Sequence, residues 1–237
     1  MNRIALMVLR NIFKVPGLYA KLCRYAKNPD KFPEQERWDH IRHILQLGVS
    51  TGNLDLQVTG VDNIPAPGSG FMMYANHQGL FDILAITASF DKPWAAVMKK
   101  ELYNLPMLKQ MARCTKSLSL DREDVRQGLE VIRAVTKEVE SGRNYLIFPE
   151  GTRSKQGNKL LEFHNGTFRC ATKSKCVILP IALVNTYKVF DEKGTKPVEV
   201  EVHFLKPIPY EEYEGMNTME VAELVRGRIA EVVEKHA

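Results

Sequence analysis

The chain has 237 residues, of which 44% are hydrophobic and 26% charged, and its formal net charge is +5 at pH 7. This length suits one α/β domain with a small addition, and no segment approaches the ~20 apolar residues that cross a bilayer or looks like a secretory signal. The basic excess comes without a zinc-finger spacing, an aromatic-rich motif or an arginine-rich helix, which argues against nucleic acid as a partner.

The first predicted helix covers residues 2–25, with a kink or break at Pro16. At 3.6 residues per turn its apolar residues share one side, and a line of basic residues lies opposite: Arg3, Arg10, Lys14 and Lys21. Two interpretations stand side by side. Either the apolar face enters a membrane surface with the cations near anionic headgroups, or it covers the protein core and the basic face lies in water.

A second helix begins at Pro33, a favourable first-turn residue, and ends near Gly48. Its histidines, His40 and His43, are expected to be surface residues. We therefore divide the chain into a two-helix appendage at the N-terminus, residues 1–52, and an α/β domain, residues 53–237.

From residue 54 onward, predicted strands alternate with predicted helices. Strands are expected at 54–58, 71–76, 94–98, 116–120, 144–149, 176–184 and 198–204, and helices at 80–90, 101–112, 123–141, 165–173 and 218–235. Such alternation predicts right-handed crossovers and a mostly parallel sheet with helices on both faces. The strand 198–204 alternates apolar and polar residues cleanly, and we expect it at a sheet edge.

Two motifs directly follow apolar strands. His77-Gln78-Gly79-Leu80-Phe81-Asp82 follows the strand 71–76, and Phe148-Pro149-Glu150-Gly151-Thr152-Arg153-Ser154 follows the strand 144–149. Ligand sites of open α/β sheets gather at the carboxyl ends of the strands, so both motifs are expected at one rim. There the carboxylate of Asp82 can bend back to hold one nitrogen of His77, leaving the other free to accept a proton.

In order and spacing, these motifs resemble the signature of the glycerolipid acyltransferase family, which includes the 1-acylglycerol-3-phosphate acyltransferases. Ser119-Leu120-Asp121-Arg122 and Val177-Ile178-Leu179-Pro180-Ile181 match two further family blocks more loosely. The resemblance covers roughly residues 63–205. It implies transfer of a fatty acyl group from a thioester, acyl-CoA or acyl-carrier protein, to the sn-2 hydroxyl of 1-acylglycerol 3-phosphate, which gives phosphatidic acid. It also favours the membrane interpretation of the N-terminal helices, at the cytoplasmic side of a membrane.

For this chemistry we assign His77 as the base and Asp82 as its orienting partner. A thioester is already activated and its thiolate leaves easily, so a serine or cysteine nucleophile is unnecessary. The sequence agrees, because it contains no Gly-x-Ser-x-Gly elbow. We expect direct attack by the acceptor hydroxyl.

Cationic side chains at the rim are candidates for the substrate phosphate. Arg153 suits it because a guanidinium binds oxyanions through paired, charge-assisted hydrogen bonds. Arg122 corresponds to the arginine of the family's intermediate block. Lys100 is a third candidate, and a solvated surface lysine is its alternative.

Three residues next to Arg153 are expected to position the substrate. Gly151 lets the backbone approach and offers its amide, and Thr152 is placed beside it. Glu150 has two open roles, as a hydrogen-bond acceptor for the glycerol hydroxyl or as a clamp on Arg153.

No cofactor is expected beyond the thioester co-substrate, and no metal site, since the six histidines are scattered. A basic region follows the second motif and could attract coenzyme A or acyl-carrier protein: Lys155, Lys159, Arg169, Lys173 and Lys175. The alternatives are acyl transfer to glycerol 3-phosphate or to another lysophospholipid, a thioesterase, and a non-enzymatic membrane-lipid-binding protein.

Overall fold

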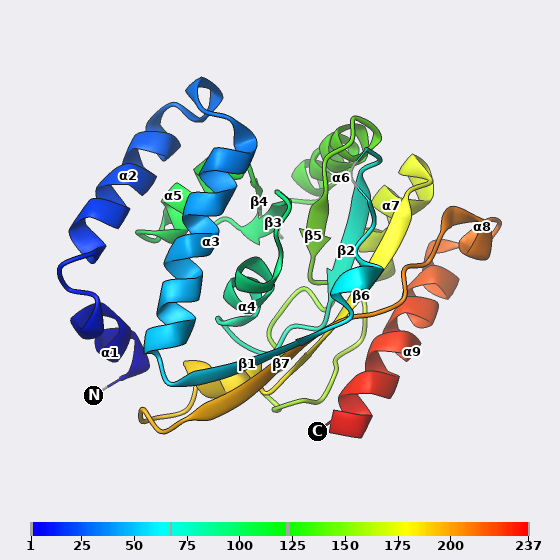
Figure 1. Ribbon diagram of the computed structural model, residues 1–237. Helices are drawn as coiled ribbons and strands as arrows, with labels where there is room; N and C mark the ends of the chain where they lie inside the picture. Colours follow the sequence, from blue (N-terminus) through cyan, green and yellow to red (C-terminus); the bar gives the residue numbers. More distant parts are fainter. Residues whose placement is uncertain (1, 67, 122–123, 237) are drawn as a thin grey trace.

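The computed structural model describes residues 2–66, 68–121 and 124–236 (Figure 1). Within these residues a seven-stranded sheet has the order β1-β7-β6-β2-β5-β3-β4, and every neighbouring pair is parallel except β6 with β7. The strands are β1 (Leu54–Thr59), β2 (Phe71–Ala75), β3 (Ala95–Lys99), β4 (Leu118–Leu120), β5 (Tyr145–Ile147), β6 (Val177–Val184) and β7 (Val198–Phe204). The predicted α/β fold with a mostly parallel sheet is confirmed.

The predicted edge position of the strand 198–204 is wrong. β7 lies between β1 and β6, and β1 forms the edge. Val200, Val202 and Phe204 are buried, whereas Glu199 on the other face is exposed. On that other face exposure falls along the strand to the buried His203, so the alternation reflects one fully buried face and one partly covered face, which an interior strand shows as clearly as an edge strand.

Helices pack against both faces of the sheet (Figure 1). One apolar cluster joins the sheet to α6 (Val125–Glu140), α7 (Arg169–Ser174) and α9 (Thr218–His236). A second cluster joins the opposite face to α3 (Glu34–Thr51) and α4 (Asp82–Ser89). A short helix, α8 (Tyr210–Tyr213), precedes α9.

The N-terminal segment contains one helix more than predicted. Residues 2–25 divide into α1 (Arg3–Arg10) and α2 (Val15–Lys27), because Pro16 stands in the first turn of a new helix rather than inside a continuous one. Pro106 similarly divides the predicted helix 101–112 into a 3₁₀ turn, Leu102–Asn104, and α5 (Leu108–Cys114). α2 and α3, from the predicted two-helix appendage, share an apolar cluster with α4 and α5 of the predicted α/β domain. The division of the chain into two parts at residue 52 therefore stays a prediction.

α1 contacts the rest of the protein through polar side chains and through the buried Leu6. The buried guanidinium of Arg3 donates hydrogen bonds to the carbonyl oxygens of Gly52 (2.7 Å), Lys196 (2.9 Å) and Val189 (3.1 Å). Arg10 donates to the Thr51 carbonyl at 2.8 Å. The buried Arg3 is thus not available as a headgroup cation, whereas Arg10 is exposed.

The apolar side of α1 faces outward. Its exposed residues, with those of the following turn, are Ile4, Val8, Leu9, Ile12 and Phe13, and Phe13 is 98% exposed. α2, by contrast, buries Leu22 and Tyr25 against α3 and α5, so the core-covering interpretation holds for α2 and not for the exposed face of α1. No helix among the described residues has both the length and the hydropathy to cross a membrane.

Candidate active site

His77 and Asp82 form the contact that their spacing predicts. His77 follows β2, Asp82 is the first residue of α4, and Nδ1 of the ring lies 2.7 Å from Oδ2 of the carboxylate. A carboxylate can only accept hydrogen bonds, so Nδ1 carries the proton and Nε2 is left as the basic nitrogen. The imidazole is partly exposed to the cavity described below, whereas the carboxylate is fully buried.

The carboxylate of Asp82 is itself held in place by the turn that connects it to His77. Oδ2 also accepts hydrogen bonds from the backbone N–H groups of Gln78 (2.6 Å) and Gly79 (3.0 Å), and Oδ1 accepts one from the Thr186 hydroxyl (2.5 Å). Its position at the start of α4 adds the favourable end of the helix dipole. The partner of His77 is therefore rigidly oriented, as a base in a fixed tautomer requires.

The two motifs are joined by hydrogen bonds at the rim of the sheet. The backbone N–H of His77 donates to Oε1 of Glu150 at 2.9 Å, and the backbone N–H of Ser154 donates to the His77 carbonyl at 2.8 Å. The ring of Phe148 stacks on the His77 imidazole with centroids 4.3 Å apart. The second motif thus fixes both the backbone and the ring plane of His77.

Glu150 takes neither of the two roles expected from the sequence. Its side chain is only 2% exposed, and its carboxylate accepts hydrogen bonds from the backbone N–H groups of His77 and of Leu161 (3.2 Å). Arg153 instead lies 3.5 Å from Asp191. Glu150 therefore links the backbone of His77 to that of the loop at Leu161 and holds the two in place.

Burial raises the pKa of Glu150 from its ordinary 4.5 to about 7, although the two backbone N–H groups act against this. The folded protein then keeps this proton to a higher pH than the unfolded chain, so the free energy of unfolding should fall as pH rises from about 4.5 to about 7. In Glu150→Gln this part of the pH dependence should be missing. Urea denaturation at several pH values in this window checks it, and an unchanged slope in the variant would contradict the assignment.

The turn requires a glycine at position 151, but the backbone N–H of Gly151 is used within the turn and is not free for a substrate. Its φ is +67°, and a Cβ there would lie 2.9 Å from the His164 ring, so glycine suits both the backbone and the space. Its N–H donates to the Phe148 carbonyl at 3.1 Å, within the turn, which makes the predicted free amide wrong. Thr152 is exposed and lines the cavity.

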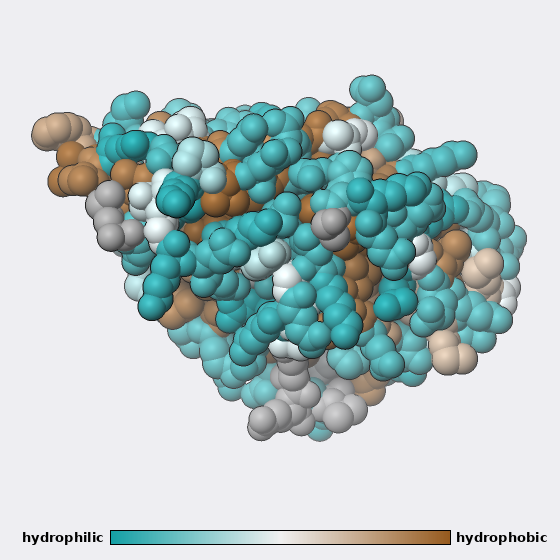
Figure 2. All heavy atoms as spheres, turned by 90° about the horizontal axis from the view of Figure 1, so that it is seen from below, coloured by the Kyte–Doolittle hydropathy of each residue, from teal (hydrophilic) through white to brown (hydrophobic). Residues whose placement is uncertain are grey.

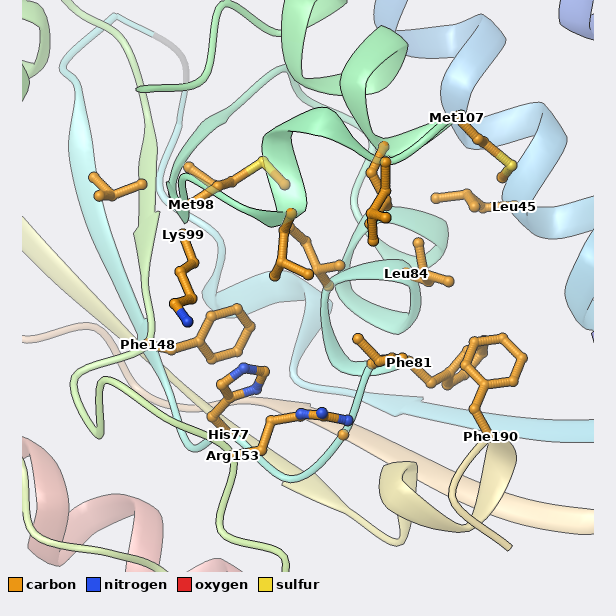
Figure 3. A pocket seen from close by; sticks show the side chains of 18 of the residues that line it. Leu45, His77, Phe81, Leu84, Met98, Lys99, Met107, Phe148, Arg153 and Phe190 are labelled. Carbon is orange, nitrogen blue, oxygen red and sulfur yellow. The ribbon is translucent and has the colours of Figure 1, made fainter. Parts of the chain in front are cut away.

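The cations at the rim differ from those predicted. Arg153 lines the cavity beside His77 (Figure 3). Lys100 does not line it; its ammonium lies 3.5 Å from Asp121, on the outside. Lys99, which was not among the predicted cations, points into the cavity toward Phe148. Arg122 lies outside the described residues.

A cavity of about 890 Å³ opens at His77 and Arg153. Its walls are mostly apolar and extend to the N-terminal helices and to the loop before α5, as Leu45, Leu84 and Met107 show in Figure 3. A volume of this size with few polar groups at one end is typical of a site for a ligand with a long apolar part.

Two further polar residues support the site, of which the sequence analysis had placed only Asn76 at this rim. Thr186 is fully buried, and its hydroxyl and backbone N–H contact Asp82 and Gln78 from the far end of β6. Asn76, which follows β2, forms two hydrogen bonds with the backbone of Leu183 on β6. Both depend on contacts across the sheet, and the only sequence signal was their position after apolar strands.

An oriented histidine beside a cationic side chain, at the mouth of an apolar cavity, is an arrangement typical of an active site that takes a ligand with a long apolar part. A sequence model of the acyltransferase family matches residues 55–184, a segment that contains both motifs and most of the sheet. The chain belongs to the acyltransferase family.

Individual relatives agree with this family. The chain is 34% identical over 122 residues to the 1-acyl-sn-glycerol-3-phosphate acyltransferase of Helicobacter pylori, covering 52% of each protein. It is 28% identical over 202 residues to the Saccharomyces cerevisiae protein of that name (81% of this chain, 63% of the relative) and 29% identical over 201 residues to that of Salmonella typhimurium (81% and 82%). The matches thus span about half of the first relative and less than two thirds of the second.

A solved structure shares the fold along nearly the whole chain. It is the crystal structure of the 1-acyl-sn-glycerophosphate (LPA) acyltransferase PlsC from Thermotoga maritima, with a TM-score of 0.79 and 23% identity. The similarity covers 99% of this chain and 97% of that one. The N-terminal helices therefore belong to the shared architecture.

Proposed function

We propose that this protein transfers a fatty acyl group from an acyl thioester to the sn-2 hydroxyl of 1-acylglycerol 3-phosphate, forming phosphatidic acid. The observation that carries the proposal is the 2.7 Å contact between His77 and Asp82 at the mouth of the apolar cavity, with Arg153 on the same rim. The names of the relatives in Helicobacter, yeast and Salmonella support the choice of acceptor.

In this reaction Nε2 of His77 accepts the proton of the acceptor hydroxyl as its oxygen attacks the thioester carbonyl. A C–O bond forms, the C–S bond breaks, and the proton passes from the imidazolium to the departing thiolate. Asp82 keeps the ring in the required tautomer and stabilises its protonated form. Direct transfer needs no covalent acyl-enzyme.

The substrate contacts follow from the charges and the shape of the cavity. Arg153 and Lys99 supply positive charge for the phosphate, and the apolar walls suit an acyl chain. These walls suit the acyl chain of the donor and also that of an acceptor that already carries one. The donor is acyl-CoA or acyl-carrier protein, and the basic region after the second motif suits the phosphorylated part of either.

An acceptor screen tests the proposal. The purified protein is incubated with radiolabelled acyl-CoA or acyl-carrier protein and with 1-acylglycerol 3-phosphate, glycerol 3-phosphate or a lysophospholipid with a larger headgroup. We expect labelled phosphatidic acid from the first acceptor as the main product. Preference for another acceptor would overturn the assignment, and free labelled fatty acid alone would indicate a thioesterase.

Arg153→Ala is expected to weaken transition-state binding of acceptors with a phosphomonoester by about 1.5–3 kcal/mol, the value of a hydrogen bond to a charged group. The measurement is kcat/KM for 1-acylglycerol 3-phosphate and for a phosphate-free monoacylglycerol. Lys100→Ala is the matched control, because this cation is on the same rim but outside the cavity. Equal losses on both acceptors would contradict a role in phosphate binding.

We also propose that the exposed apolar residues of α1 and the following turn rest on the cytoplasmic surface of a membrane. Figure 2 shows hydrophobic atoms protruding at the left end of the molecule, on the side where α1 lies in Figure 1. α1 and α2 also line the cavity, through residues such as Ile4 and Leu22, so a lipid in the membrane is next to the site. Protruding apolar side chains on a helix are typical of peripheral membrane contact.

Replacing Phe13 with serine is expected to weaken binding to anionic liposomes by about 1.5–3 kcal/mol, the value of burying such a side chain in an apolar medium. Cosedimentation measures it. Met219→Ser on α9 is the control, because Met219 is also well exposed but belongs to another part of the surface. Unchanged sedimentation of Phe13→Ser would count against α1 as the contact surface.

A further inference from the structure

A cluster of two histidines and one glutamate lies on the α9 side of the sheet. Glu201 and His203 are alternate residues of β7, so they share a face, and His236 lies in the last turn of α9. Oε2 of Glu201 is 2.8 Å from Nε2 of His203 and 2.7 Å from Nδ1 of His236. The three side chains present one nitrogen or oxygen each, all within 4.8 Å of one another. None of the three is among the described residues that line the cavity.

Among the described residues, no lysine or arginine forms an ion pair with the carboxylate of this cluster. The carboxylate of Glu201 is only 14% exposed, and its ion-pair partners in the described chain are the two imidazoles rather than a lysine or arginine. A largely buried carboxylate without a lysine or arginine beside it is poorly compensated, and a divalent cation compensates it.

His203 is also held as a metal ligand usually is. Its other ring nitrogen, Nδ1, lies 2.7 Å from the hydroxyl oxygen of Thr59 on the neighbouring strand β1. In this structure Nε2–H donates to the carboxylate of Glu201, which can only accept, and Nδ1 accepts from the Thr59 hydroxyl. When a metal ion takes the place of the Nε2 proton, Nδ1–H can donate to the same hydroxyl, because a hydroxyl both donates and accepts. A hydrogen bond from the second nitrogen to a fixed acceptor is the arrangement that orients ligating histidines.

We propose that Glu201, His203 and His236 bind one divalent transition-metal ion of the zinc type, which fastens the end of α9 to β7. Two imidazoles and a carboxylate suit Zn²⁺, Co²⁺ or Ni²⁺ rather than Mg²⁺ or Ca²⁺. Tetrahedral bonds of about 2.0–2.2 Å place ligand atoms roughly 3.4 Å apart. The two short contacts therefore open by roughly 0.6 Å on binding, which the half-exposed His236 at the helix end allows.

The test is a titration of the chelator-stripped full chain with Zn²⁺ by isothermal calorimetry, with Mg²⁺ as a parallel titrant. We expect one Zn²⁺ per chain in the wild type and no Mg²⁺ binding. Thr59→Val, which removes only the hydroxyl contact, should weaken Zn²⁺ binding about 10–100-fold, and His236→Ala at least as much. His43→Ala, an exposed histidine on α3, is the matched control and should bind as the wild type does.

Because His77 and Asp82 form another pair of potential ligands, His77→Ala is titrated as well. The proposal requires Zn²⁺ binding to persist in this variant and to weaken in His236→Ala. No stoichiometric binding to the wild type, or unchanged affinity in His236→Ala, overturns it. Loss of binding in His77→Ala alone assigns the ion to the active site and overturns it equally.

Discussion

Replacing His77 with alanine is expected to reduce kcat by about 10²–10⁴-fold, the contribution of a positioned general base. The ring lies at the mouth of the cavity rather than within the packed core, so its removal leaves the fold and the apolar walls in place. Lipid binding should therefore change little, while the proton of the acceptor hydroxyl loses its acceptor. The loss should appear in kcat and not in KM.

Steady-state kinetics with 1-acylglycerol 3-phosphate and an acyl thioester measure this effect, with binding of the acceptor determined separately. His43→Ala controls for loss of a histidine remote from the site. Activity of His77→Ala within about tenfold of the wild type would contradict the role of base, because such a change is below the range of this kind of catalysis.

Asp82→Asn is expected to lower kcat by up to about 10⁴-fold, as happens when the carboxylate beside a catalytic histidine is made neutral in serine proteases. An asparagine oxygen at the Oδ2 position can still accept from His77, Gln78 and Gly79, and its amide can donate to the Thr186 hydroxyl. The turn is thus preserved, but the negative charge that stabilises the imidazolium is gone.

The measurement is kcat together with the unfolding midpoint in urea. We expect a large loss of turnover with a modest change in stability. If the folded variant keeps wild-type kcat, Asp82 is a structural anchor of the turn and not a partner in catalysis. Thr186→Val is the companion variant, since it removes a hydrogen bond to Asp82 and leaves the charge intact.

Local patterns predicted the sheet and the contact between His77 and Asp82. The strands follow apolar runs bounded by turns, and the two site residues are close in sequence, so the geometry of one turn brings them together. Glu150 is different. Its hydrogen bonds to the backbone of His77 and Leu161 depend on how two loops meet, which no local pattern encodes.

The error between Lys99 and Lys100 has a simple physical cause. Successive residues at the end of a strand point to opposite faces, so a shift of one residue exchanges the cavity for the outer surface. The sequence placed a lysine pair at the rim, but only the register of β3 shows that Lys99 is the one that faces the cavity.

α1 shows the same limit for a helix. The sequence predicted an apolar side and a basic side, which is all that periodicity contains. It did not reveal that carbonyl groups at Gly52, Val189 and Lys196 form a site for the Arg3 guanidinium, which turns the apolar side outward. Likewise, Glu201 and His236 meet only because α9 packs back across the sheet.

The most direct measurement follows a radiolabelled acyl group during a single turnover with 1-acylglycerol 3-phosphate, in the wild type and in His77→Ala. The wild type should pass the label straight to phosphatidic acid with none bound to protein, and His77→Ala should leave it on the thioester. Label trapped on the wild-type protein, or phosphatidic acid formed equally fast without the imidazole, would contradict direct attack assisted by His77.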